Sequence, residues 1–194
     1  MVEKIVMELV DQMEDRKIIE KSSRDYYEYV LVTLAEHIIG VGTMLIIGML
    51  FKQFIPTVIF LVFFLSLRKR TGGYHADKFW QCYLLTIITY IAIIQMAPVL
   101  SQKKVIMYAI LLFAVLVIEV IGTVNHPNID MNKDELQENK KSARLLVLME
   151  TAIIVLLITL GISQLYVSYM SIAIILCSFL MCLAKIMKQE VKVK

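Results

Sequence analysis

The chain has 194 residues, of which 59% are hydrophobic and 19% charged, and its mean hydropathy is +0.73. A soluble domain of this size carries more charge and fewer apolar residues, so the composition excludes an ordinary soluble enzyme. The net charge of +3 says less than the positions of the charges, which form short blocks between long apolar runs. We therefore predict an all-α integral membrane protein.

The N-terminal segment is charged throughout. Residues 1–25 lack an apolar core followed by a small-residue cleavage site, so we expect no signal peptide. In residues 1–20, apolar side chains recur at positions 2, 5, 6, 9, 10 and 13, which is the spacing of an amphipathic helix. This helix is too charged to span a bilayer. We expect residues 1–29 to be a cytoplasmic, interfacial segment that lies on the membrane or against the protein.

Six apolar runs follow, and a helix needs about 20 residues to span a bilayer. The second run is short, and its span has to borrow residues 51–53 or part of the loop that follows. The fifth and sixth runs are nearly fused, which predicts a tight turn at residues 164–168. We predict a domain of six transmembrane helices over residues 30–184 and a basic cytoplasmic tail, residues 185–194. The runs are residues 30–50, 54–67, 80–100, 105–124, 145–164 and 166–184.

The positive residues favour one side of the membrane. With six spans, 17 of the 20 Lys and Arg residues fall on the side that holds both termini, and Lys52, Lys103 and Lys104 fall on the other. The positive-inside rule then places both termini in the cytoplasm. The loop RKRTGGYHADKF, residues 68–79, lies on the cytoplasmic side, and Cys82 lies just inside the third span.

This loop and the span after it contain a histidine and a cysteine seven residues apart. A cysteine attacks as the thiolate and needs a nearby base, for which histidine is the usual choice. On one continuous helix, His75 and Cys82 would share a face but stand about 10.5 Å apart along the axis, too far for a hydrogen bond. Direct pairing requires the chain to fold back, which Gly72 and Gly73 permit. Asp77 is a candidate N-cap for the third span.

Spacing alone leaves other interpretations open. Cys82 can be an inert core cysteine, and His75 a solvated loop residue. A small transporter or channel would use Glu36, Glu119 and Glu150 on a polar path, but these acids do not cluster and no inverted repeat is visible. A non-catalytic scaffold is the third class. We expect Glu36 to pair with a basic residue, and Glu119 and Glu150 to snorkel to the interface.

The block RKRTGGYHADKFWQCY, residues 68–83, resembles the signature of the accessory gene regulator B (AgrB) family of bacterial peptide quorum sensing. It has a basic run at residues 68–70, a Gly-rich segment, His75 followed by alanine, and Cys82 seven residues further on. The stretch NHPNIDMNKDELQENKKSAR, residues 125–144, is similar to the Asn/His-Pro-Asn-rich loop before the last two spans of that family. With the six runs and the amphipathic N-terminus, the resemblance covers essentially the whole chain.

The resemblance implies a cysteine endopeptidase in the cell membrane of a Gram-positive bacterium. Such enzymes cut the C-terminal tail from a precursor peptide, AgrD, and help to close a cyclic thiolactone or lactone signal. Cys82 would be the nucleophile and His75 its general base. The implied partners are an AgrD-like precursor, the lipid bilayer and a second copy of the chain, with no nucleic acid. The implied acyl-transfer chemistry needs neither a metal nor an organic cofactor, and the three histidines are too dispersed to form a metal-ligand cluster.

The other candidate site residues surround this pair. The basic run serves either as positive-inside anchors or as an attractor for an acidic precursor tail, and both uses are compatible. The tentative substrate-binding residues of the catalytic loop, residues 68–82, are Arg68, Lys69, Arg70, Gly72, Gly73 and Gln81.

Overall fold

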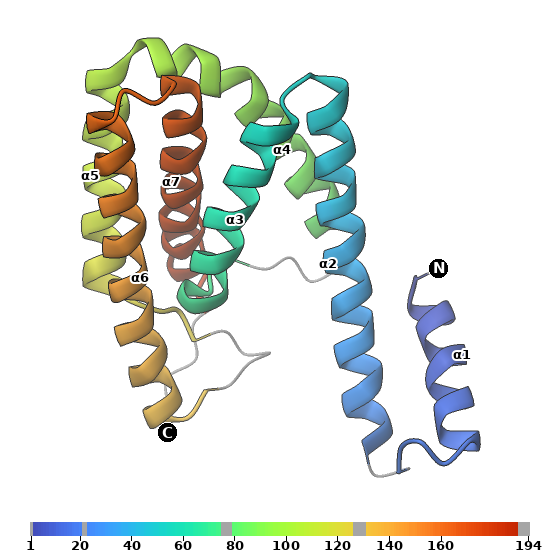
Figure 1. The fold of residues 1–194 in the computed structure, drawn as a ribbon. Helices are drawn as coiled ribbons and strands as arrows, with labels where there is room; N and C mark the ends of the chain where they lie inside the picture. Colours follow the sequence, from blue (N-terminus) through green and yellow to red (C-terminus); the bar gives the residue numbers. More distant parts are fainter. Residues whose placement is uncertain (1, 21–22, 75–78, 126–130, 190–194) are drawn as a thin grey trace. The chain divides into compact units, whose positions relative to one another are not determined.

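The structure is a computed structural model that describes residues 2–20, 23–74, 79–125 and 131–189. These residues form seven α-helices and no strand, which confirms the predicted all-α fold. The helices are α1 (Val2–Asp15), α2 (Arg24–Leu50), α3 (Phe54–Thr71), α4 (Phe79–Gln102), α5 (Lys104–Ile121), α6 (Lys133–Thr159) and α7 (Gln164–Ile186) (Figure 1).

Five of the described helices, α2, α4, α5, α6 and α7, are long and apolar enough to cross a membrane. The chain is therefore a multi-pass membrane protein. Helix α3 covers the short second run and has 18 residues. It gains length at its C-terminal end, where Arg68, Lys69 and Arg70 form the last turn, whereas residues 51–53 belong to the turn before the helix.

The turn between the last two helices lies earlier than the apolar runs predict. Residues 164–168 do not form it, because α7 already begins at Gln164 and α6 ends at Thr159. Gly161 lies in the connection with φ +70, a backbone angle that glycine adopts without strain. Hydropathy does not locate this turn, since the connecting residues are themselves largely apolar.

The chain divides into two compact units, Met1–Ile46 and Ile47–Lys194. The first unit holds α1 and most of α2. The amphipathic helix predicted at the N-terminus is present as α1, and its apolar side packs on the chain that follows it. The buried side chains of this cluster are Val6, Val10 and Ile19, with Met13, Leu31, Val32 and Ala35 packed against them. Burial of these apolar groups is the main stabilising term of the first unit.

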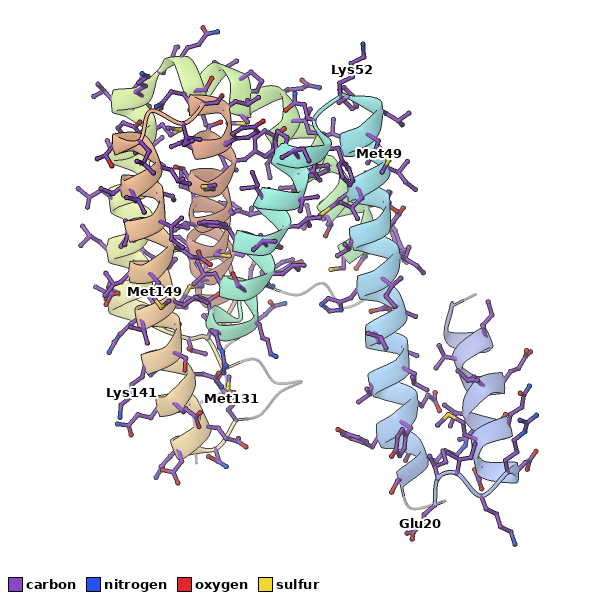
Figure 2. All side chains as sticks on the ribbon, in the orientation of Figure 1. Glu20, Met49, Lys52, Met131, Lys141 and Met149 are labelled. Carbon is purple, nitrogen blue, oxygen red and sulfur yellow. The ribbon has the colours of Figure 1, made fainter. Side chains whose placement is uncertain are left out.

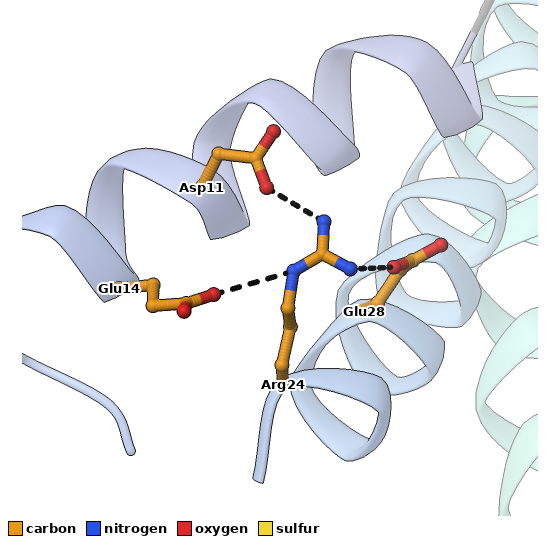
Figure 3. A network of polar contacts seen from close by, with 4 residues as sticks. All are labelled: Asp11, Glu14, Arg24 and Glu28. Carbon is orange, nitrogen blue, oxygen red and sulfur yellow. Dashed lines mark hydrogen bonds and ion pairs between the residues drawn. The ribbon is translucent and has the colours of Figure 1, made fainter. Parts of the chain in front are cut away.

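A polar network crosses from α1 to the start of α2. The Arg24 guanidinium donates to Asp11 at 2.6 Å and lies 3.4 Å from Glu14 and 3.9 Å from Glu28 (Figure 3). Exposed ion pairs of this kind contribute little free energy individually. The network therefore orients α1 against the start of α2, while the apolar cluster supplies most of the stability.

Helix α7 is the central element of the second unit. It packs against α3, α4, α5 and α6. Within its apolar window 67% of the residues are buried, compared with at most 28% in the other four candidate spans. Small residues on α7 allow neighbouring backbones to approach closely, which is how membrane helices associate. The small buried residues of α7 are Ser168, Ser171, Ala173, Cys177, Ser178 and Ala184.

The two ends of the second unit carry different polar groups. Lys52 lies at one end, and Met131 and Lys141 lie at the other (Figure 2). At the Lys52 end, the Thr57 hydroxyl lies 2.5 Å from the Tyr90 hydroxyl, and Tyr169 donates to the Gln53 side chain. These bonds connect the start of α3 to α4 and α7.

Glu150 corrects a prediction. It was expected to snorkel to the interface, yet it is only 5% exposed. Its Oε1 accepts a hydrogen bond of 2.7 Å from Ser66 on α3, and its Oε2 has no partner among the described residues. The prediction is wrong because α6 begins twelve residues before the apolar run, which places Glu150 well inside a helix packed against α3.

We expect Glu150→Met to leave the thermal unfolding midpoint in lipid nanodiscs unchanged or higher. The substitution removes a buried carboxyl oxygen without a partner, and the Ser66 hydroxyl, released from Glu150, can donate to the Val62 carbonyl 2.7 Å away. Glu150→Ala is the matched control, and it should lower the midpoint because it leaves a cavity worth about 2 kcal/mol or more. Equal losses in both variants would mean that the carboxyl group itself stabilises the fold.

Candidate active site

Cys82 lies in the first turn of α4 and is partly buried. The first backbone N–H groups of a helix have no partner within the helix, so they can stabilise negative charge that develops nearby. Beside Cys82, Trp80 and Gln81 are exposed. His75 and Asp77 lie outside the described residues, so the pairing of His75 with Cys82 and the capping by Asp77 stay predictions.

Arg68 turns back onto its own chain at the end of α3. Its Nη1 donates to the Gly72 carbonyl, and its Nη2 donates to the Tyr74 carbonyl at 2.6 Å. Among the described residues, no carboxylate lies within salt-bridge distance of Arg68. The planar guanidinium is well suited to bind two carbonyl oxygens at once, because its donors form a rigid fork. Arg68 therefore closes the turn that leads from α3 toward α4.

Gly72 and Gly73 give the chain the space and the backbone angles that this turn needs. Gly72 has φ +64, and a Cβ there would lie 2.6 Å from the Val124 carbonyl oxygen. Gly73 has φ +127, and a Cβ there would overlap Arg68 Nη1 and lie 3.1 Å from the Leu180 backbone. A side chain at either position would meet backbone or the Arg68 guanidinium.

Neighbouring segments hold the same turn from two other sides. The Tyr74 N–H donates to the Leu180 carbonyl of α7 at 3.0 Å, and the Val124 N–H donates to the Thr71 carbonyl at 2.9 Å. The Thr123 hydroxyl donates to the Arg70 carbonyl at 2.9 Å. Residues 70–74 are thus fixed between α7 and the chain that leaves α5.

A second set of bonds brings the segment before α6 to the basic turn. The buried Asn125 side chain accepts from the Met131 N–H at 2.9 Å and donates to the Met131 carbonyl at 3.4 Å. Asn139 of α6 accepts from Arg70 Nη1 at 3.2 Å. Asn132 and Glu135 start α6 with a capping box. Sequence reasoning missed these contacts, although Asn125, the first residue of the Asn-His-Pro-Asn motif, was a signal for them.

Arg68 is a partly buried cation. Burial lowers the pKa of Arg68 below its usual range. Arginine keeps its charge even when its pKa falls, so the turn that precedes α4 in the chain carries a permanent cation.

All three cysteines are free. Cys177 is buried in α7, and its thiol lies 3.7 Å from the Phe64 carbonyl of α3. Cys182 is partly buried near the end of α7. Of the two cysteines that are not fully buried, only Cys82 lies at the start of a helix and follows the turn that Arg68 closes.

The six tentative substrate-binding residues occupy different environments. Lys69 and Gln81 are exposed, and Arg70 is bonded to Asn139. Arg68, Gly72 and Gly73 are parts of the closed turn itself. Among the described residues, no group of three or more His, Cys, Asp or Glu side chains is placed to hold a metal ion.

The fold and the site describe a small multi-pass membrane protein with a partly buried cysteine at the start of one helix and a closed basic turn shortly before that helix in the chain. The family model for accessory gene regulator B (AgrB) matches residues 2–184 of the 194-residue chain. The chain belongs to this family, and its role lies in the processing of an AgrD-type quorum-sensing peptide. No curated protein and no solved structure matches the chain.

Proposed function

We propose that this protein is a cysteine endopeptidase that removes the C-terminal tail of an AgrD-type precursor and promotes cyclisation of the remaining peptide. Family membership supports the processing role. The observation that carries the chemistry is the place of Cys82: it is free, partly buried and in the first turn of α4, the helix that follows the turn closed by Arg68.

The proposed reaction is an acyl transfer in two steps. The Cys82 thiolate attacks the scissile carbonyl, a C–S bond forms, and the C–N bond breaks while His75 protonates the departing amine. This leaves the precursor core as a thioester on Cys82. A thiol or hydroxyl of the same precursor then gives its proton to His75 and attacks the thioester carbonyl, and the Cys82 sulfur leaves as the thiolate as the ring closes.

Ring closure competes with hydrolysis of the thioester. Exchange of one thioester for another changes the free energy little, so the outcome depends on positioning of the attacking group and on exclusion of water. A cysteine that is partly buried at the start of a membrane-spanning helix is suited to both requirements. No metal or organic cofactor takes part in this scheme.

The remaining parts of the proposal concern surroundings and partners. The exposed Lys69 is suited to meet an acidic precursor tail, and the exposed Gln81 to bind the precursor near Cys82. Residues 30–184 would form the peptidase domain, with both termini in the cytoplasm of a Gram-positive cell. A homodimer in the cell membrane is the proposed assembly.

The test is co-expression in membranes with a short candidate precursor that has an amphipathic leader, an internal Cys or Ser, and an acidic tail. Mass spectrometry should find two products, the free tail and a core, with the core lighter by one water when it is cyclised. If the precursor stays intact while the protein inserts normally, the proposed function is wrong.

A further inference from the structure

We propose that Arg68 is a positioning residue of the Cys82 site, which holds the 72–74 segment against α7, and that it is not a docking point for the precursor tail. The inference rests on the proposed function, because the reaction positioned is the attack by Cys82. Lys69, the next residue of the basic run, keeps the proposed role of meeting the precursor tail.

The hydrogen bonds of Arg68 are the first support. Two of its nitrogens are bound to carbonyl oxygens of the turn, those of Gly72 and Tyr74. A tail carboxylate would have to displace these bonds. Lys69, in contrast, is exposed and free of such contacts among the described residues.

The identity of the bonded atoms is the second support. The Tyr74 carbonyl belongs to the planar peptide unit that leads into His75, the proposed base. The Tyr74 N–H is bound to the Leu180 carbonyl at 3.0 Å, so both sides of Tyr74 are held. His75 lies outside the described residues. Tyr74 is the last described residue before it.

The glycines are the third support. Any side chain at Gly73 would overlap Arg68 Nη1, and one at Gly72 would lie 2.6 Å from the Val124 carbonyl. The Gly-Gly pair is therefore required by the position of the guanidinium and of residue 124. Packing within the turn therefore explains both glycines without any contact with a substrate.

The charge-preserving variant Arg68→Lys distinguishes the positioning of the turn by Arg68 from electrostatic attraction of the precursor tail. A lysine ammonium keeps the positive charge but lacks the rigid fork that binds two carbonyls. Purified wild type, Arg68→Lys and Lys69→Gln are compared with the precursor from the co-expression test. We expect Arg68→Lys to lower kcat about a hundredfold with KM little changed, since small misplacements at a reacting centre have effects of this size. Lys69→Gln should raise KM, and the KM values of wild type and Lys69→Gln should come closer together at high salt.

One readout does not depend on the precursor. Amide hydrogen exchange at Tyr74 should be faster in Arg68→Lys than in wild type, because the carbonyl of Tyr74 loses its bond to the guanidinium. If Arg68→Lys does not accumulate in the membrane, Arg68→Gln, whose amide can reach one carbonyl, is measured in the same way.

Either of two results would overturn the inference: a kcat in Arg68→Lys equal to that of wild type, or an unchanged rate of Tyr74 exchange. Failure of wild type to cleave would reject the proposed function instead, and the exchange measurement would still decide whether Arg68 holds the turn.

Discussion

Cys82→Ala should lower the rate of precursor cleavage by more than about 10³-fold, because it removes the atom that forms the acyl-enzyme. The fold should tolerate the change, since Cys82 is only partly buried and forms no disulfide. Cleavage rate per inserted protein is the measurement, with product formation followed by mass spectrometry.

Cys182→Ala is the matched control. It removes another free, partly buried cysteine from a membrane-spanning helix, so any general effect of losing a thiol appears there as well. We expect wild-type cleavage in this variant. A transporter or a scaffold would tolerate both substitutions, and equal cleavage by Cys82→Ala and wild type would exclude Cys82 as the nucleophile.

Gly73→Ala should have the second largest effect. The added methyl group would overlap the Arg68 guanidinium and approach the Leu180 backbone, in a residue with φ +127 that alanine rarely adopts. The expected result is a fall in kcat of about a hundredfold with faster hydrogen exchange at Tyr74.

The control for Gly73→Ala is Gly161→Ala. Gly161 also has a positive φ, +70, but a Cβ there meets nothing within 4 Å. Both variants carry backbone strain of about 1–3 kcal/mol, and only Gly73→Ala also disturbs Arg68. Equal activity in the two variants would show that backbone strain alone matters and that the contact with Arg68 does not.

Much of the fold was accessible from the sequence, because a helix that crosses a bilayer needs a long apolar run, and because the 3.6-residue period of the N-terminal segment predicts the amphipathic helix α1. The limits are physical. The turn near Gly161 is apolar, so hydropathy could not locate it. The C-terminal extension of α3 through Thr71 involves bonds made by Arg68 and Gly72. Glu150 was misjudged because depth depends on which helix packs beside it, here α3.

The candidate site was predictable in its residues and less so in its geometry. A histidine, a cysteine and two glycines in one polar loop indicated where to look. The bonds from Thr123 and Val124 to the basic turn join segments about fifty residues apart in the chain. No local pattern encodes such contacts, so the packing of residues 123 and 124 against the basic turn was not predicted.

The most direct test of the central claim is to trap the acyl-enzyme. A precursor whose internal Cys or Ser is replaced by Ala cannot cyclise, so the core should remain on the protein as a thioester until water attacks it. Intact-protein mass spectrometry after rapid acid quenching should show an adduct of the core mass on wild type and on Cys182→Ala. The adduct should be released by hydroxylamine and be absent from Cys82→Ala. An adduct that persists in Cys82→Ala, or cleavage by wild type with no adduct at any quench time, would contradict covalent catalysis by Cys82.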